Sequence, residues 1–405
     1  MAPATVPRPT KNAKLRLMKV ERRLHAVLWL HVGFAATGLG TTLLGCLLPA
    51  LHSAWHLSDS WAGFLFACQF TGASLGALLV RKNFFQSLTH GYLLLILSAA
   101  TLGIIQHHAA PMLFFVFGLG LGWVMTATSM LVGTMFERRG AALSLLNVSW
   151  VVGAVLSPAI ASIWVRHRTP TSIFLVFGIF VTAIALLIWH NRGSVLEGRI
   201  LSSRVYVQEK HLSLIAGFAL VAFLYVGVEV SVSGWMMTYV HRLPIREGEW
   251  AAIITSSFWI AFLSGRALAP AVLLRLSETN LLIAAMVTAL VSLALLLVSQ
   301  TPLTILLTTV CAGLTLAPIF PLCIARVLAL TNESPQSKWV FSIAGLGGAV
   351  LSWLTGRLST YTGSLRDGLF VPVFALGGML LIFLTIARRS HRESDSGLRV
   401  ISSTE

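Results

Sequence analysis

Long apolar stretches, separated by short polar turns, constrain this chain more than any other feature. A helix needs about 20 mostly apolar residues to cross the hydrocarbon core of a lipid bilayer. The sequence contains twelve such stretches, so we predict an all-α membrane protein with twelve transmembrane helices. Their predicted bounds are 25–51, 59–80, 91–107, 112–136, 141–165, 172–190, 212–240, 250–271, 280–299, 302–326, 338–360 and 369–388.

Composition supports a lipid environment. Of the 405 residues, 56% are hydrophobic and only 11% are charged, whereas soluble proteins average about 25% charged residues. In water, such a chain would expose large apolar patches. The first apolar stretch is longer than the core of a cleavable signal peptide, so we expect it to remain as the first helix.

Positive charge gathers in particular loops. The net charge is +15, but there is no basic face interleaved with aromatic residues, so we expect no nucleic-acid partner. If the N-terminus is cytoplasmic, 21 of the 29 Lys and Arg residues fall in cytoplasmic segments and five in outer loops. Cytoplasmic loops of membrane proteins carry such an excess. We therefore place both termini in the cytoplasm and the chain in the cell (inner) membrane.

A polar linker divides the chain into two sets of six helices. We predict one six-helix bundle over 25–190 and another over 212–388, joined by a cytoplasmic linker at 191–211. A basic segment, 1–24, precedes the first bundle, and a cytoplasmic tail, 389–405, follows the second. We expect a monomer.

The two sets of helices repeat each other. The five residues Gly-Ala-Val-Leu-Ser at 153–157 recur at 348–352, an offset of 195. A second offset, 189, relates positions in the first two helices of each set. The matched pairs are Gly38 and Gly227, Gly45 and Gly234, Trp61 and Trp250, and Gly76 and Gly265. Two constant offsets indicate duplicated bundles.

Glu229 is the one acidic residue that we place deep in an apolar stretch. The other 13 of the 14 acidic residues fall in loops, tails or helix ends. A charge near the bilayer centre costs about 3 kcal/mol or more, so it usually has a function or a partner. Burial also favours the neutral form of a carboxyl group. We favour a carboxylate that binds protons or substrate; the alternative is a structural ion pair.

Three arginines lie within the predicted helices. Counting helical rise from each helix start puts Arg357 at the depth of Glu229, and Arg266 near the cytoplasmic face. We therefore expect Arg357, not Arg266, to pair with Glu229. Arg266 and Arg326 are expected to extend to the inner interface and hold a cytoplasmic gate.

Amide and aromatic side chains supply further candidates. Gln69 and Asn147 can hydrogen-bond a polyhydroxy solute or a neighbouring helix, and both alternatives stay open. Trp150, Trp235 and Trp259 lie within helices, where a tryptophan packs on a sugar ring or fills the core. Paired carboxylates, phosphate loops and clusters of metal ligands are missing from the sequence, so we predict neither an enzyme nor a cofactor or metal site.

Twelve helices in two parallel repeats resemble the major facilitator superfamily. That resemblance implies a solute site between the halves near the bilayer midplane, and alternate opening to either side. Closer motifs lie in the seventh helix (224–235), in the eighth (Phe258-Trp259, then Gly265-Arg266) and in the tenth (Ala317-Pro-Ile-Phe-Pro321). With Asn147, they resemble the glucose/mannose-type branch of the fucose–galactose–proton symporter family.

The family resemblance implies proton-coupled sugar uptake. Position by position it points to Glu229 and Asn147, with Gln69 and Trp259 as weaker candidates. Fucose-type members carry acidic residues in their first and fourth helices, which this chain lacks, so any coupling rests on Glu229. The predicted partners are a small-molecule substrate, protons and the lipid bilayer.

A rival prediction is proton-coupled efflux of drugs, metabolites or amphiphiles. Efflux families carry Gly-x-x-x-Asp-Arg/Lys-x-Gly-Arg between helices two and three, whereas Gly76 to Lys82 here lacks the aspartate and the second glycine. The efflux motif of helix five, Gly-x-x-x-Gly-Pro, is nearly met from Gly153 to Pro158. A lipid carrier and a transporter-like receptor remain further alternatives.

Overall fold

A computed structural model describes residues 11–104, 107–136, 138–193, 212–244, 249–331 and 337–402, and the regular structure in these ranges is helical. The first half comprises α1 (Lys11–Trp55), α2 (Asp59–Leu78), α3 (Phe84–Ile104), α4 (Ala110–Met135), α5 (Arg139–Val165) and α6 (Ser172–His190), with the short helix η1 (His107–Ala109) before α4. The second half comprises α8 (Leu212–His241), α9 (Glu249–Leu273), α10 (Glu278–Val298), α11 (Pro302–Leu316), α12 (Ile319–Thr331), α13 (Ser337–Thr362), α14 (Leu365–Gly368) and α15 (Phe370–Ser402).

Eleven candidate membrane spans lie within the described residues. They correspond to eleven of the twelve predicted helices, and α13 corresponds to the twelfth. Gly, Ser and Thr make α13 less apolar than the others. Because α13 packs against both α2 and α8, much of its surface contacts protein, where small polar residues pack well.

Several helices depart from their predicted bounds. α3 begins at Phe84 rather than at 91, because Asn83 caps it: the Asn83 side-chain oxygen accepts a hydrogen bond from the backbone N–H of Gln86 at 3.2 Å. The predicted helix at 302–326 is divided into α11 and α12 beside Pro318, which has no N–H to continue the helical ladder.

The outermost helices are longer than predicted. α1 begins within the predicted basic segment, and α15 continues to Ser402 through the predicted tail. The prediction followed apolar length, whereas helix formation continues past the last apolar residue when Arg, Ser and Glu are compatible with it. Residues 194–211 of the predicted linker lie outside the described residues.

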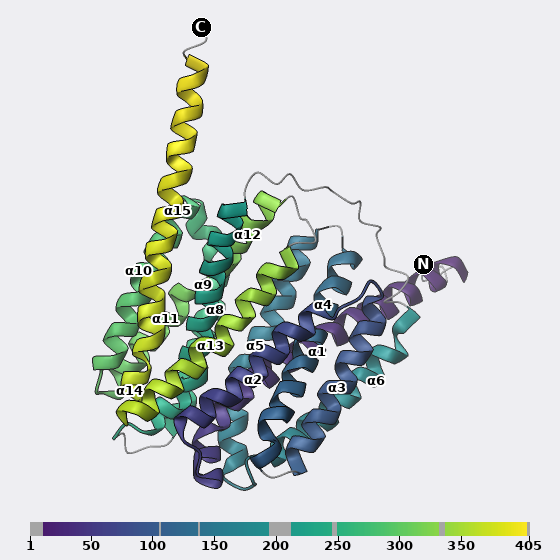
Figure 1. Ribbon diagram of the computed structural model, residues 1–405. Helices are drawn as coiled ribbons and strands as arrows, with labels where there is room; N and C mark the ends of the chain where they lie inside the picture. Colours follow the sequence, from purple (N-terminus) through teal and green to yellow (C-terminus); the bar gives the residue numbers. More distant parts are fainter. Residues whose placement is uncertain are drawn as a thin grey trace, which may run out of the picture.

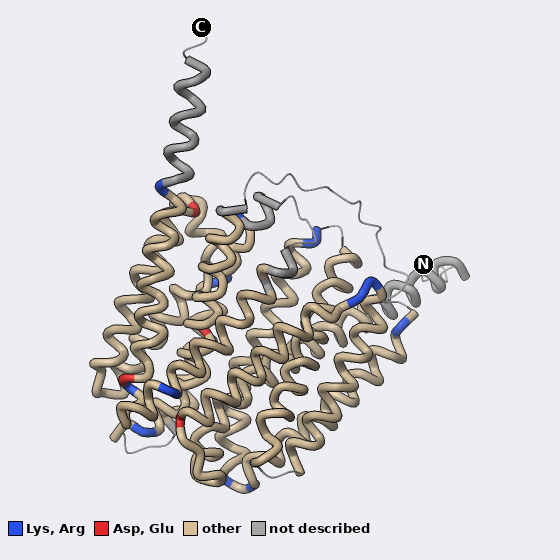
Figure 2. Tube along the Cα trace, viewed as in Figure 1, with Lys and Arg blue, Asp and Glu red and all other residues tan. Residues whose placement is uncertain are grey.

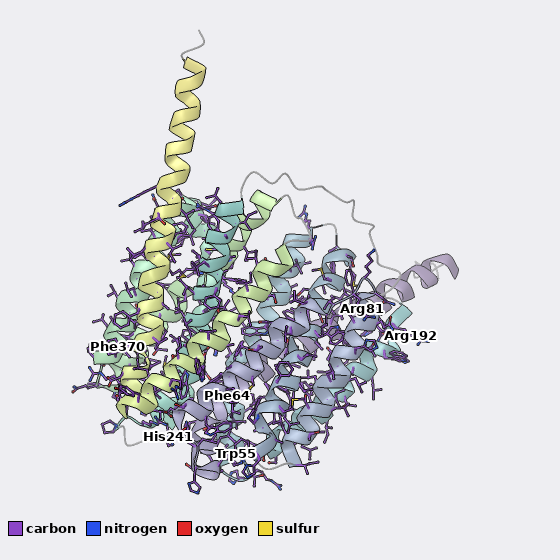
Figure 3. All side chains as sticks on the ribbon, viewed as in Figure 1. Trp55, Phe64, Arg81, Arg192, His241 and Phe370 are labelled. Atoms are coloured by element: carbon purple, nitrogen blue, oxygen red, sulfur yellow. The ribbon has the colours of Figure 1, made fainter. Side chains whose placement is uncertain are left out.

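The two halves lie side by side, and the long helices run between the two ends of the bundle (Figure 1). Figure 3 places Arg81 and Arg192 toward one end, and Trp55 and His241 at the opposite end. We call the first the terminal end, because α1 begins there and α15 ends there, and the second the distal end. Charged residues gather at both ends and are sparse in between (Figure 2), as expected for helices in an apolar medium.

Equivalent glycines make equivalent contacts in the two halves. A Cβ atom on Gly76 of α2 would collide with the carbonyl oxygen of Leu119 in α4. A Cβ atom on Gly265 of α9 would likewise collide with the carbonyl oxygen of Leu314 in α11. Leu119 and Leu314 are themselves related by the offset of 195. The repeat in the sequence is therefore a repeat of close helix packing.

The halves contact each other through α1 and α8, α2 and α13, and α5 and α9. Gly45 of α1 and Gly234 of α8, which are repeat mates, meet at this boundary. A Cβ atom on Gly45 would lie 2.6 Å from the carbonyl oxygen of Gly234. The first helices of the two repeats therefore touch backbone to backbone.

Candidate functional site

Glu229 lies in the interior of the protein. It is 12 residues before the distal end of α8, or roughly 18 Å along the helix axis at about 1.5 Å per residue. Its side chain is half-buried and is on the opposite face of α8 from Leu220, which is 45% exposed. The carboxylate predicted to be deep therefore points inward from the middle of its helix.

Tyr225 and Arg266 surround this carboxylate. Arg266 of α9 supplies the positive charge that acts on Glu229, and Tyr225, one turn earlier on α8, interacts with both. Two polar atoms of this cluster lack a partner: the Tyr225 hydroxyl and the Arg266 Nε atom form no hydrogen bond of good geometry in the described residues. The Arg266 guanidinium lies over the Phe262 ring, 4.5 Å from its centroid, which gives it an apolar support.

The expected pairing of Glu229 with Arg357 is wrong. Arg357 is exposed and lines a groove at the distal end of α13. Arg266 lies 17 residues into α9 from its distal end, or roughly 25 Å, so its Cα is only about 7 Å deeper than that of Glu229. The long arginine side chain spans that gap. Helical rise locates Cα atoms, but it gives neither side-chain reach nor the face of the helix.

Two tryptophans join the halves beside this cluster. The rings of Trp150 in α5 and Trp259 in α9 meet edge to face, with centroids 5.4 Å apart. Ser256 of α9 donates a hydrogen bond to the backbone oxygen of Val155 in α5 at 3.1 Å. The Trp150 indole N–H has no partner in the described residues. The tryptophan pair therefore offers an apolar surface and an unused donor at the boundary.

Two further predicted substrate-binding residues, Gln69 and Trp235, have different surroundings. Gln69 is 1% exposed and donates to the backbone oxygen of Thr41 in α1 at 2.9 Å, while its side-chain oxygen has no described partner. Trp235 is fully buried, and its indole N–H donates to the Ser352 backbone oxygen at 3.2 Å. Gln69 therefore keeps one free acceptor, whereas Trp235 fills the core.

Asn147 is exposed and lies eight residues from the terminal end of α5. The exposed apolar stripe of α5 contains Leu145, Val148 and Val152, and Asn147 lies on the opposite, inward face, also exposed. Further along the inward face, Val151 and Ala154 are buried. The side-chain amide donates to the Leu143 backbone oxygen at 3.0 Å. Exposure on an inward face indicates that the halves are apart at the level of Asn147 and closed beyond it.

The remaining predicted gate residue, Arg326, contacts only its own half among the described residues. Its guanidinium donates to the Thr279 hydroxyl at 2.7 Å and lies 3.5 Å from the Glu278 carboxylate in α10. It also lies over the Phe383 ring of α15, 5.7 Å from the centroid. These contacts hold the terminal end of the second half together.

The strongest polar contact between the halves was not foreseen from the sequence. Arg242, directly after the end of α8, holds the Asp59 carboxylate of α2 with two hydrogen bonds, both 2.7 Å long. The Ser359 hydroxyl of α13 donates to the same carboxylate, and His52 Nε2 lies 3.2 Å from it. The Asp59 side chain is 9% exposed. We call these four residues the distal latch.

A second contact reinforces the distal latch. The Ser60 backbone N–H donates to the Thr360 hydroxyl of α13 at 2.7 Å. Asp59 occupies the first turn of α2, a position where acidic residues are common because they offset the helix dipole. The sequence therefore explains Asp59 by its place at the start of a helix and does not indicate its contact with the other half. Nothing in the sequence shows which acidic residue at a helix start becomes buried.

Comparisons with known proteins bear on this arrangement. Residues 30–337 match the family model of the Major Facilitator Superfamily. The glucose/mannose transporter GlcP of Bacillus subtilis is 22% identical over 385 residues, covering 89% of this chain and 94% of that protein. The major facilitator superfamily domain-containing protein 4A of Danio rerio is 31% identical over 187 residues, 44% of this chain and only 35% of that protein's length.

A solved structure shows the same fold. The FucP transporter in its outward conformation aligns with a TM-score of 0.62 at 15% identity, covering 90% of this chain and 99% of FucP. The family model, the helical repeat and this fold agree with one another. The chain belongs to the Major Facilitator Superfamily and is a multi-pass membrane transporter for a small molecule.

Proposed function

We propose that the protein carries a sugar by proton-coupled symport, with Glu229 as the proton-binding residue. The observation that carries the proposal is the cluster of Glu229, Tyr225 and Arg266 in the interior of the second half, in which the Tyr225 hydroxyl and the Arg266 Nε atom lack a described partner. Buried polar groups are normally hydrogen-bonded. A cluster that leaves a hydroxyl and a guanidinium nitrogen unpaired has donors available for a solute.

The sugar assignment draws support from the chemistry around the cluster. The tryptophan pair Trp150 and Trp259 supplies an apolar surface suited to one face of a sugar ring. The free side-chain oxygen of Gln69 and the exposed amide of Asn147 supply hydroxyl partners from the first half. The similarity to a protein named as a glucose/mannose transporter supports the same substrate class.

The coupling would operate through charge balance. An ionised Glu229 is attracted to Arg266, and a protonated Glu229 releases Arg266 for the solute. The two forms therefore differ in their affinity for substrate, and such a difference shifts the balance between conformations. In this proposal the protein lies in the inner membrane, and its terminal end faces the cytoplasm. It acts as a monomer.

Uptake into proteoliposomes tests this proposal. Radiolabelled glucose, mannose, galactose and fucose are supplied with and without an inward proton gradient. Accumulation of one hexose above the external concentration, only with the gradient, is the expected result. Glu229→Gln should abolish that accumulation, whereas Glu278→Gln, which alters a carboxylate on a side chain that is 52% exposed, should retain it. Uptake of no hexose under either condition would contradict the proposal and favour efflux.

A further inference from the structure

A surface groove at the distal end lies outside the central site. It encloses about 530 Å³ and is open on one side, where α2, α13 and the start of α15 meet. Its walls are mainly apolar, formed by Leu354, Leu358 and Val371, with Tyr361, Arg357 and Ser60 at the margins. The volume falls in the range of about 300–1,000 Å³ that is typical of sites for small ligands.

Arg357 gives this groove a specific charge. It is exposed, and no described acidic side chain pairs with it. A cation among leucines, in a helix that crosses the bilayer, is costly unless an anion or water solvates it. The groove therefore combines an apolar wall with one unsatisfied guanidinium, a match for an amphiphile with an anionic head.

The depth of Arg357 fits the head of a membrane lipid. It lies five residues before the end of α13, or about 7–8 Å below that end. Tyr361, one turn beyond, is 89% exposed, and exposed tyrosines are typical of the headgroup level. Leu354 and Val350, at 39% exposure each, continue the same face deeper into the membrane. The face thus changes from apolar to cationic where a lipid changes from acyl chain to phosphate.

We propose that this groove binds an acidic phospholipid, with the phosphate on Arg357, the region between head and chains against Leu358 and Val371, and an acyl chain deeper along Leu354 and Val350. A guanidinium group recognises phosphate oxygens through paired N–H donors. Arg357 is the one charged residue in the described lining of the groove, so it favours a lipid with a net negative head over a zwitterionic one.

The lipid would also contact both halves. Ser60 belongs to the first half, and the other lining residues belong to the second. The Ser60 backbone already donates to Thr360 across this seam. Because the groove is complete only when the distal ends meet, the bound lipid favours the distally closed conformation.

Native mass spectrometry of the purified full-length transporter tests the site. Phosphatidylglycerol and phosphatidylcholine with identical chains serve as probes, and inorganic phosphate is the head without a chain. We expect tighter binding of phosphatidylglycerol, and about fivefold weaker binding in Arg357→Gln, the usual effect of one basic residue at a lipid surface. Arg366→Gln removes the same charge from an exposed residue at the same end that does not line the groove, and should bind like the wild type.

A second variant addresses the apolar wall of the groove. Val371→Trp fills the groove without changing charge and should also weaken phosphatidylglycerol binding. Equal binding in the wild type and Arg357→Gln would overturn the proposal, as would an Arg366→Gln effect as large as that of Arg357→Gln. Binding of inorganic phosphate as tight as that of phosphatidylglycerol would also overturn it, because the site would then be a simple anion site.

Discussion

Two carboxylates in the interior of this transporter have opposite surroundings. Asp59, at the start of α2, is held by Arg242 and Ser359 from the other half and by His52 from its own. Glu229, in the middle of α8, interacts with Arg266 and Tyr225, both from its own half. One carboxylate is held across the boundary between the halves, and the other interacts with groups of its own half.

The difference indicates two roles. A fully paired carboxylate between two bodies stabilises the arrangement in which they touch, so Asp59 favours distal closure. A loosely held carboxylate changes its protonation and partners at small cost, so Glu229 is suited to binding and coupling. Alternating access requires both: a contact that breaks when the halves rock, and a site that responds to its ligands.

The largest expected effect follows from Glu229→Gln. The amide keeps the shape but cannot exchange a proton, so proton-driven accumulation of sugar should disappear. Exchange of labelled sugar between two sides at equal concentration should continue, because it needs no net proton movement. Accumulation ratios and exchange rates in the same proteoliposomes measure both. If the Glu229→Gln variant still accumulated sugar, Glu229 would not be the coupling residue, and the proposed difference in role between Glu229 and Asp59 would be wrong.

Asp59→Asn should act on conformation instead. We expect it to weaken the distally closed state by about 1–2 kcal/mol. This is less than the ~3–5 kcal/mol lost on breaking a fully buried pair, because the Arg242 side chain is 41% exposed and solvent screens it. Transport should slow in both accumulation and exchange. A loss confined to accumulation would mean that Asp59, not Glu229, couples protons.

Arg266→Gln should weaken substrate binding. Without this cation, Glu229 loses its charged neighbour and the solute loses a donor, so we expect the half-saturating sugar concentration to rise about tenfold or more, the effect of losing one hydrogen bond to a charged group at about 1.5–3 kcal/mol. Initial rates over a range of sugar concentrations measure this. Arg275→Gln, at an exposed turn, is the matched control. An unchanged half-saturating concentration would exclude Arg266 from the site.

The smallest effect is expected from Gly45→Ala. Its Cβ atom would press on the carbonyl oxygen of Gly234, so the halves would close less tightly and transport should slow about fivefold, at the lower end of the ~1–3 kcal/mol cost of overpacking. Gly378→Ala in α15 meets nothing within 4 Å and should leave transport unchanged. Equal rates for Gly45→Ala and the wild type would show that this backbone contact does not limit closure.

Sequence reasoning found the helices and the central carboxylate for a simple physical reason. Apolar length and the cost of a buried charge are both local properties, so twelve helices and Glu229 could be identified without a structure. Helix ends were less predictable, because Asn83 extends α3 through a cap and Pro318 interrupts the tenth predicted helix.

The partners of the charges could not be predicted in the same way. Choosing Arg357 over Arg266 required the face of each helix and the reach of each side chain, which are tertiary properties. The distal latch depended on packing between α2, α8 and α13. Asp59 and Arg242 are 183 residues apart, and nothing in the local sequence of either indicates the other.

The central claim is that the distal latch holds the halves together at one end while the site stays accessible from the other. Spin-label distance measurements test it most directly, with the four native cysteines replaced and new ones at the exposed positions Ser53 and His241. The control pair, Arg81 and Arg275, reports the terminal end. For the substrate-free transporter we predict one narrow, short distal distance, and for Asp59→Asn an added longer population with a shortened terminal distance. Identical distance distributions with and without the Asp59→Asn change would contradict the account.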